Sequence, residues 1–182
     1  MGKRDITVKI AEGKFNYRVG AIIIDSGKIL MARNIDSPFY YTVGGRIQFG
    51  ESAHEAVLRE AFEETQIHFE IDRLAYIHEN FFIMEMDGEI YHEVCLFFLF
   101  KPNILVRGIE HSTFKEEEYG DVELHWLPID KLQNLQLYPE FFKSELINPA
   151  KETKYFVTKN DITTLMQGMA HNHCANVKSF HI

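Results

Sequence analysis

The feature that most constrains this chain is a predicted helix that carries three glutamates close together. The segment at residues 44–67 has the sequence "GGRIQFGESAHEAVLREAFEETQI" and contains Glu60, Glu63 and Glu64. Like-charged side chains three or four residues apart on an exposed helix repel each other by about 0.2–0.5 kcal/mol per pair. The repulsion grows where water is partly excluded. We therefore expect a functional reason for keeping these carboxylates together.

The start of this helix is marked by Ser52 and Glu55, which have the S-x-x-E spacing of a capping box. The helix is therefore predicted to begin at about Ala53. With a turn of about 100° per residue, the three glutamates fall on an arc that borders the apolar one. Ala53 and Ala56 share the acidic arc, and their small side chains leave room for a ligand. The apolar arc, which we expect to face the core, contains Val57, Leu58, Ala61 and Phe62.

Two interpretations of the acidic arc are open. A solvated acidic face is the ordinary explanation for a glutamate-rich helix. The alternative is a bound divalent cation, because Mg²⁺ prefers hard oxygen ligands. Gly44 and Gly45 favour the cation, since they allow a tight turn that frees carbonyls to face a ligand. The spacing of Glu51 and Arg59 favours it too, because it allows an ion pair that ties this loop to the helix.

The spacing of these residues resembles the Nudix box, G-x5-E-x7-R-E-U-x-E-E-x-G-U, in which U is aliphatic. Every charged position is filled, and a pattern with this many fixed positions is specific. Two positions depart from it, with Gln66 in place of the usual glycine and Val43 where many members have proline. Neither position carries chemistry. The matching residues are Gly45, Glu51, Arg59, Glu60, Ala61, Glu63, Glu64 and Ile67.

The resemblance implies a Nudix pyrophosphohydrolase, which is a hydrolase acting on acid anhydrides. Such MutT-like enzymes use Mg²⁺ or Mn²⁺ to hydrolyse a nucleoside diphosphate linked to another moiety. The glutamate that acts as general base differs between members, so it stays open here. By resemblance, the catalytic set is Glu51, Arg59, Glu60 and Glu63, and the metal ligands are the Gly44 carbonyl, Glu60, Glu63, Glu64 and Glu118.

Glu118, the last of these ligands, lies outside the Nudix box. Many members add a carboxylate from a later loop, and the run "KEEEYGD" at residues 115–121 offers Glu117 or Glu118. A solvated charge run explains this stretch equally well. Glu79 and Glu93, on facing strands of a predicted hairpin, are rivals, and a structural hydrogen bond is the default expectation for both.

Substrate contacts are predicted near the glycine pair. Arg46 is the first candidate for a phosphate contact, ahead of Arg33 and Arg18. Phe39 and Tyr40 precede the loop and are candidates for stacking on a base, with core packing as the alternative. The signatures of members specific for ADP-ribose, diadenosine polyphosphates or NADH are missing, so the identity of the substrate is left open.

The remaining pattern predicts an α/β fold. Strands dominate, with one long helix early and short helices late, which indicates a mixed central sheet with helices on its faces. The resemblance makes this a Nudix-type α/β/α sandwich over residues 1–158. We expect residues 159–182 to be a loosely packed or disordered tail rather than a metal site, despite its H-x-H-C run. The predicted strands and short helices lie at residues 15–25, 28–33, 74–85, 90–101, 122–128, 128–135, 139–146 and 153–158.

Composition excludes several classes of protein. The 182 residues have a formal net charge of -8, which argues against general nucleic-acid or membrane binding because both require a basic surface. The longest apolar run, at residues 94–100, is too short to span a bilayer. Two cysteines make no disulfide framework. We expect a cytoplasmic protein whose partner is a nucleotide-type small molecule, and a homodimer is left open.

The hydrolase has one rival from another class. A Nudix-fold module that binds or senses a nucleotide derivative without cleaving it also explains the glycine loop. Such modules usually lose acidic positions, whereas Glu60, Glu63 and Glu64 are all present. The sequence therefore favours Mg²⁺-dependent hydrolysis of a pyrophosphate bond.

Overall fold

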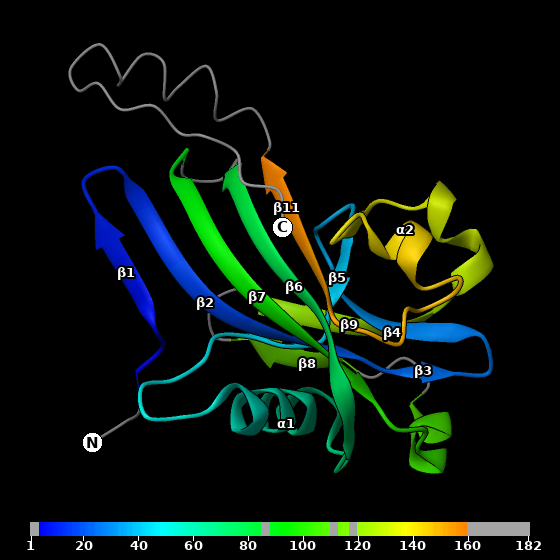
Figure 1. Cartoon of the computed structure of the whole chain (residues 1–182). Coiled ribbons are helices and arrows are strands. Elements are labelled where there is room, and N and C mark those ends of the chain that lie inside the picture. Colours follow the sequence, from blue (N-terminus) through cyan, green and yellow to red (C-terminus); the bar gives the residue numbers. More distant parts are fainter. Residues whose placement is uncertain (1–3, 85–87, 110–112, 117–119, 160–182) are drawn as a thin grey trace.

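The fold is built from two mixed β-sheets with helices on both sides (Figure 1). The computed structural model describes residues 4–84, 88–109, 113–116 and 120–159. Within these ranges the predicted α/β class with mixed sheets is confirmed.

The first sheet has five strands in the order β1-β2-β7-β6-β11. Its central pair, β2 and β7, is parallel over nine residue pairs, whereas β6 and β7 are antiparallel. β11 adds a parallel edge beside β6. The strands are β1 (Thr7–Ile10), β2 (Gly13–Ile22), β6 (Ile71–Ile83), β7 (Ile90–Phe100) and β11 (Lys154–Lys159).

The second sheet has six strands, with β10-β5-β4-β9-β8 in order and β3 paired to β4. β4 lies at its centre and pairs antiparallel with both β5 and β9. The strands are β3 (Ile24–Asp25), β4 (Lys28–Asn34), β5 (Tyr40–Thr42), β8 (Thr113–Glu116), β9 (Gly120–Pro128) and β10 (Leu137–Tyr138).

One long helix and three short ones complete the described fold. Helix α1 crosses one side of the sheets, and α2 lies on the other side, near β5 (Figure 1). In the part of the chain that the structure describes, no helix has the length and apolar character needed to cross a membrane. The helices are α1 (Ala53–Thr65), η1 (Ile104–Gly108), η2 (Ile129–Asn134) and α2 (Phe142–Glu145), of which η1 and η2 are 3₁₀-helices.

The early strands differ from the prediction in their pairing. The predicted strand at residues 15–25 is divided at Ile23, and only its last two residues form the hairpin with β4. Ser26 and Gly27 make the predicted tight turn, with φ of 50° and 74°, as in the turns that join twisted hairpins. β2 pairs with β1 and β7 instead, and only residues 19–22 at its end are buried on both faces.

Other predicted elements are confirmed. The hairpin of β6 and β7 is present, although residues 85–87 of its turn lie outside the described residues. The strands predicted at residues 122–128 and 153–158 correspond to β9 and β11. The short helices predicted late in the chain correspond to η2 and α2.

The two faces of the sheets are covered by separate apolar clusters. On one face, α1 packs Val57 and Ala61 against β2 and the end of β7. On the other face, Phe142 of α2 packs with Tyr76 of β6 and Met31 of β4. α1 is therefore held rigidly against β2, which fixes the acidic side chains relative to the sheet.

Helix α1 begins as predicted, with the Ser52–Glu55 capping box in place. Its end differs from the family pattern, because Gln66 occupies the left-handed conformation at φ 59° and ψ 22° that glycine usually takes there. The Gln66 side-chain amide donates to the carbonyl oxygens of Phe62 and Glu63, at 3.3 and 3.0 Å. The bond to Glu63 satisfies a carbonyl at the helix end, whereas the Phe62 carbonyl also accepts the backbone amide of Gln66 at 2.7 Å.

The buried side of α1 is rotated from the predicted arc. Ala56 and Glu64, expected to border the core, are buried, whereas Leu58 and Phe62 are only partly buried. The prediction that Ala56 leaves room for a ligand is therefore wrong. The cause is the second sheet, which extends the surface on which α1 packs.

One buried histidine makes the stability of the fold depend on pH. His78 on β6 is 5% exposed, and its Nε2 lies 2.9 Å from the hydroxyl of Thr158 on β11. Burial lowers the pKa of His78 from 6.5 to about 4. Between these values the unfolded chain binds a proton that the folded chain does not, so stability falls as the pH drops below about 6.5.

We predict that His78→Gln reduces this acid sensitivity. Its amide keeps a partner for Thr158 but does not titrate. Between pH 7 and pH 5 the wild type loses about 1–2 kcal/mol of unfolding free energy through His78. Urea unfolding at both pH values measures this as a smaller difference in the variant. Equal differences for both proteins would show that folding does not change the pKa of His78.

Candidate active site

The candidate site is organised by a short extended segment beside β2. The amides of Val19 and Ala21 donate to the carbonyls of Gly45 and Val43, at 2.9 and 2.8 Å. Gly44 has φ 142°, and a Cβ there would lie 2.3 Å from the carbonyl oxygen of Val19. Only glycine allows this backbone to approach β2 so closely. The glycine pair thus places the loop beside β2, at the edge of the first sheet and next to α1.

Gly45 brings this loop against the acidic side of α1. A Cβ on Gly45 would lie 2.5 Å from the carboxylate carbon of Glu60 and 2.5–2.6 Å from both of its oxygens. The missing side chain of Gly45 is therefore the space that the Glu60 carboxylate occupies. The motif requires glycine here because the loop and the helix meet at this point.

A buried ion pair closes the loop on the helix, as the sequence predicts. Nε and Nη2 of Arg59 donate to the two oxygens of Glu51 at 2.8 and 3.0 Å. The Glu51 side chain is 3% exposed and also accepts the amide of Gln48 at 3.0 Å. Arg59 further donates to the carbonyl of Arg46 at 3.1 Å. The bidentate geometry fixes the orientation of the guanidinium as well as its position.

The same guanidinium reaches two of the three helix glutamates. Nη1 of Arg59 lies 2.8 Å from Glu60 and 3.2 Å from Glu63. The carboxylate pair that would repel on a bare helix is thus bridged by a cation. Glu51, Glu60 and Glu63 meet at this one arginine, which makes Arg59 the electrostatic centre of the described site.

The third helix glutamate faces inward. Glu64 is buried at 7% exposure, and its Oε1 accepts the amide of Gly44 at 2.7 Å. The three acids therefore have three environments: Glu64 is buried against the loop, Glu60 is half-buried and Glu63 is 56% exposed at its side chain. Only Glu60 and Glu63 present carboxylates at the surface of the site.

Burial sets the electrostatic character of Glu60. Loss of solvent raises the pKa of its carboxyl, and the neighbouring Glu63 raises it further, against the lowering effects of Arg59 and Arg18. The pKa of Arg59 is raised, chiefly by its hydrogen bonds to Glu51. The site therefore holds a carboxylate that an additional cation would stabilise.

Two arginines lie along the same edge of the sheet. Arg18 and Arg46 face each other across an isolated bridge between β2 and the glycine loop. The guanidinium of Arg46, the predicted phosphate contact, lies 3.8 Å from Asp5. The guanidinium of Arg18 lies 3.5 Å from Glu93, which is buried at 9% exposure. No sequence motif marked Asp5 as the ion-pair partner of Arg46.

The predicted aromatic contacts lie on the second sheet. Tyr40 packs against His125 edge-to-face at 5.4 Å, and the guanidinium of Arg33 lies 5.4 Å from its ring. Phe39 is 36% exposed and packs against Tyr138 at 5.3 Å. These contacts describe a packed cluster, and base stacking by Phe39 or Tyr40 stays a prediction.

The other predicted carboxylates are separated by the structure. Glu79 is on the opposite face of the hairpin from Glu93, where it bonds to His92 at 2.8 Å and to the hydroxyl of Tyr155. Its expected structural role is confirmed. Glu117 and Glu118 lie outside the described residues, as does the His-Cys run of the tail.

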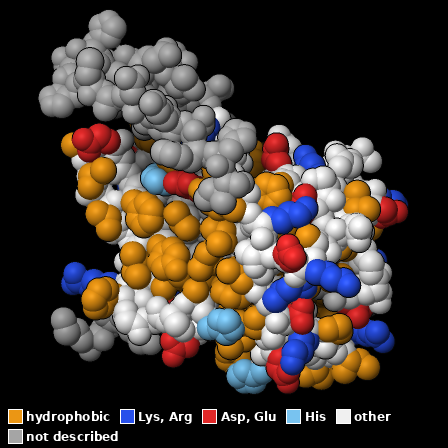
Figure 2. Space-filling view, viewed as in Figure 1, with side chains coloured by type: hydrophobic (Ala, Val, Ile, Leu, Met, Phe, Trp, Pro, Cys, Tyr) orange, Lys and Arg blue, Asp and Glu red, His pale blue; other side chains and the backbone are white. Residues whose placement is uncertain are grey.

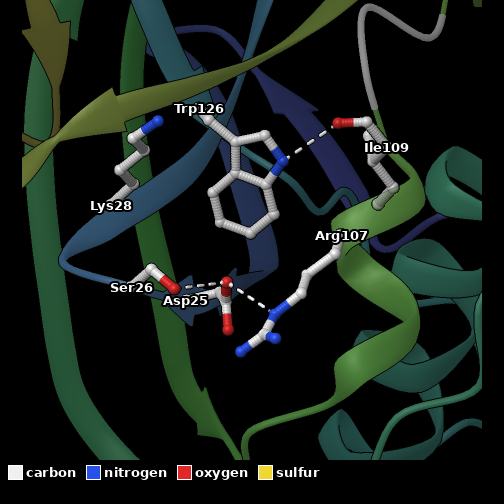
Figure 3. Close-up of a pocket in the computed structure, with 6 residues that line it drawn as sticks. All are labelled: Asp25, Ser26, Lys28, Arg107, Ile109 and Trp126. Carbon is white, nitrogen blue, oxygen red and sulfur yellow. Dashed lines mark hydrogen bonds and ion pairs between the residues drawn. The ribbon is translucent and has the colours of Figure 1, made fainter.

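A hollow of about 500 Å³ lies elsewhere, between the β3–β4 turn and η1 (Figure 3). Arg107 contacts Asp25 there at 3.4 Å, beside the indole of Trp126, whose Nε1 donates to the Ile109 carbonyl. None of the predicted site residues lines it. The surface hollow and the acidic site are therefore different places on the molecule.

The donor set fits a divalent cation in its chemistry. Glu60 and Glu63 supply hard oxygen atoms, and the gap at Gly45 accommodates one of these carboxylates. Among the described residues no three acidic, histidine or cysteine side chains already converge as a metal site. Instead Arg59 bridges Glu60 and Glu63.

Comparison with known proteins identifies the family. A model of the NUDIX domain matches residues 14–146, which include the glycine loop, α1 and the second sheet, and the first sheet apart from β1 and β11. The chain belongs to the Nudix family. The match places the Glu51–Arg59 pair and the helix glutamates within a known type of domain.

Two curated relatives share part of the Nudix domain. A Bacillus subtilis (strain 168) protein named "Putative 8-oxo-dGTP diphosphatase" is 44% identical over 52 residues, or 27% of this chain and 35% of that protein. A "MutT-like protein" of Streptomyces ambofaciens is 31% identical over 61 residues, or 34% of this chain and 40% of that protein. The matches thus span well under half of either relative.

Solved structures show the same fold. A MutT protein from Bacillus halodurans has a TM-score of 0.59 at 23% sequence identity, covering 80% of this chain and 92% of that chain. A MutT protein from Methanosarcina mazei has a TM-score of 0.53 at 20% identity, covering 74% and 91%. At this identity the likeness establishes the Nudix fold.

We predict that Glu51→Gln destabilises the protein by about 2–3 kcal/mol, because it leaves the Arg59 charge poorly compensated in a partly buried site. Glu70→Gln is the matched control, since Glu70 pairs with Lys101 on the surface and such pairs contribute little. Chemical denaturation at pH 7 measures both. Equal small effects would mean that the buried pair does not hold the loop.

Proposed function

We propose that this Nudix protein hydrolyses a pyrophosphate bond in a nucleoside diphosphate linked to another moiety, with Mg²⁺ or Mn²⁺ as cofactor. One observation carries the proposal: Glu60 and Glu63 meet at Arg59 directly against the glycine loop. A solvated acidic face has no need for this loop or for the buried Glu51.

Glu60 and Glu63 are the residues that would hold the metal, with the Gly44 carbonyl as a further ligand. Glu64 and Glu118 belong to the proposed set by family pattern, and Glu64 is engaged with the loop. When bound, a divalent ion neutralises phosphate oxygens and lowers the pKa of a bound water. The raised pKa of Glu60 supports a cation here, because burial disfavours its charge.

Each remaining group has a role that follows from its contacts. Arg59 and Glu51 hold the loop and the helix together and keep Glu60 and Glu63 adjacent. Glu64 fixes the Gly44 amide, which sets the direction of the loop backbone. We assign Arg46, and Arg18 beside it, to the phosphate end of the substrate, because both lie along the edge that carries the acids.

The substrate class is the finer part of the proposal. The Bacillus subtilis relative is named for 8-oxo-dGTP, so nucleoside triphosphates and their oxidised forms are the first compounds to test. Nucleotide sugars and dinucleotides complete the panel. Phe39 and Tyr40 are assigned to the base end of the substrate as predicted.

We expect Mg²⁺-dependent release of phosphate or a phosphomonoester from at least one compound, and a loss of about a hundredfold or more in kcat in Glu63→Gln. Glu63 is largely exposed, so its substitution leaves the fold intact. Glu70→Gln serves as the charge-matched control and keeps wild-type rates. Chromatographic separation of the substrate from its products, with and without EDTA, measures the effect.

Two outcomes would contradict this assignment. Wild-type rates in Glu63→Gln would remove that residue from the catalytic set. Tight binding of a nucleotide across the panel without turnover would favour the module that senses nucleotides without cleaving them.

The glycine loop gives a second, independent test. Gly45→Ala places a methyl group within about 2.5 Å of the Glu60 carboxylate, so we expect kcat to fall by about tenfold or more while the fold persists. Gly108→Ala is the matched control, because a Cβ there meets nothing within 4 Å. Steady-state kinetics measure kcat of both variants, and thermal melting shows whether their fold persists. Unchanged kinetics in Gly45→Ala would show that Glu60 moves freely without cost.

A further inference from the structure

A broad apolar area lies on the face of the first sheet beyond α1. Figure 2 shows hydrophobic side chains gathered over β1, β2, β7 and β6, above α1 in this view. Val8 and Val157, at its two borders, are 50% and 48% exposed. Contiguous exposed apolar patches of this kind often mark interaction sites. We name it the front face, defined by Val8, Phe15, Tyr17, Phe81, Val94 and Val157.

Strand register shows that the front face is continuous. One row of directly paired residues crosses all five strands: Val8, Phe15, His92, Phe81 and Lys159. Residues paired directly across strands point to the same side of a sheet. The ring centroid of His92 lies 4.1 Å from that of Phe81 and 5.5 Å from that of Phe15, so these three side chains are on the same side.

The next row places Tyr17, Val94, Glu79 and Val157 on the same side. Glu79 is the acidic member of this row, and it is already bonded to His92 and Tyr155. Helix α1 covers the sheet only farther along the strands, where His54 contacts Phe98. The front face is therefore apolar apart from engaged polar groups, and α1 leaves it uncovered.

The size of the front face fits a single segment of chain. Five strands spaced about 4.8 Å apart make it roughly 20 Å wide, and its two rows, about 7 Å apart along the strands, make it roughly 10 Å high. The resulting area of about 200 Å² is a quarter of what one partner buries in a standard protein–protein interface, about 800 Å². A helix of about 13 residues is roughly 20 Å long and about 10 Å across, so it spans this width.

The chain supplies such a segment at the border of the front face. β11 ends at Lys159, which is paired with Phe81 in the row described above. Residues 160–182 follow directly and lie outside the described residues. Their sequence has Ile162, Leu165, Met166 and Met169 at the spacing i, i+3, i+4, i+7, which is typical of one apolar side of an amphipathic helix.

We propose that residues 160–182 pack across the front face through this apolar stripe. The segment starts at the face, and its 23 residues are long enough to cross it. As a helix, the stripe from Ile162 to Met169 is about 10 Å long and covers half of that width. Burial of the front face by its own chain stabilises the exposed sheet, because each buried aliphatic or aromatic side chain contributes about 1.5–3 kcal/mol. This inference does not depend on the chemistry at Glu60 and Glu63.

The test uses the full chain with two substitutions at a time. Leu165→Asp with Met166→Asp puts charge on the stripe. Thr164→Asp with Gln167→Asp is the matched control, because these positions lie on the opposite side of the same helical wheel. Hydroxyl-radical footprinting reports the accessibility of Tyr17 and Phe81, and light scattering on a sizing column reports the oligomeric state.

We expect oxidation of Tyr17 and Phe81 to rise at least threefold in the stripe variant and to stay at the wild-type level in the control. Self-association that appears only in the stripe variant also supports the proposal, since it follows from an uncovered apolar face. Equal oxidation in both variants would overturn it. So would a wild-type dimer that loses protection of Tyr17 on dilution, because a second copy would then cover the face.

Discussion

The candidate site depends on the buried ion pair between Glu51 and Arg59. A carboxylate that is 3% exposed is costly to bury unless a cation compensates it. Arg59 compensates it with two hydrogen bonds and uses its remaining Nη1 donor for Glu60 and Glu63. Loop closure and the grouping of the acids therefore come from a single side chain.

The glycine pair makes this arrangement sterically possible. Gly44 lets the loop approach the β2 backbone, and Gly45 leaves the space that the Glu60 carboxylate fills. Backbone pairing with Val19 and Ala21 then aligns the loop with the sheet. Because α1 is packed on the same strand, the loop, the sheet and the helix form one rigid support for the acids. Charge repulsion among the glutamates is tolerated because this support holds them.

The proposed phosphate-binding arginine on β2 and the front face lie at different places on the first sheet. The edge of β2 near the glycine loop carries Arg18 and faces Arg46. The side of this sheet on which α1 packs also carries Glu79 and the front face, farther along the strands. Glu79 and Glu93 are near neighbours in the hairpin, yet they point to opposite sides, because successive residues of a strand alternate. Arg18 and Glu93 therefore lie on one side of the first sheet, and the front face lies on the other.

The sequence by itself determined the elements that rest on local chemistry. The capping box at Ser52, the Glu51–Arg59 pair, the hairpin of β6 and β7 and the α/β class all follow from short-range spacing. Only the tertiary structure decided that Ala56 and Glu64 are buried and that Arg59 bridges Glu60 and Glu63. It also decided that β2 pairs in parallel with β7. The reason is physical: spacing along the chain fixes which side chains share a side of an element. Which side is covered depends on strands and helices that are distant in sequence.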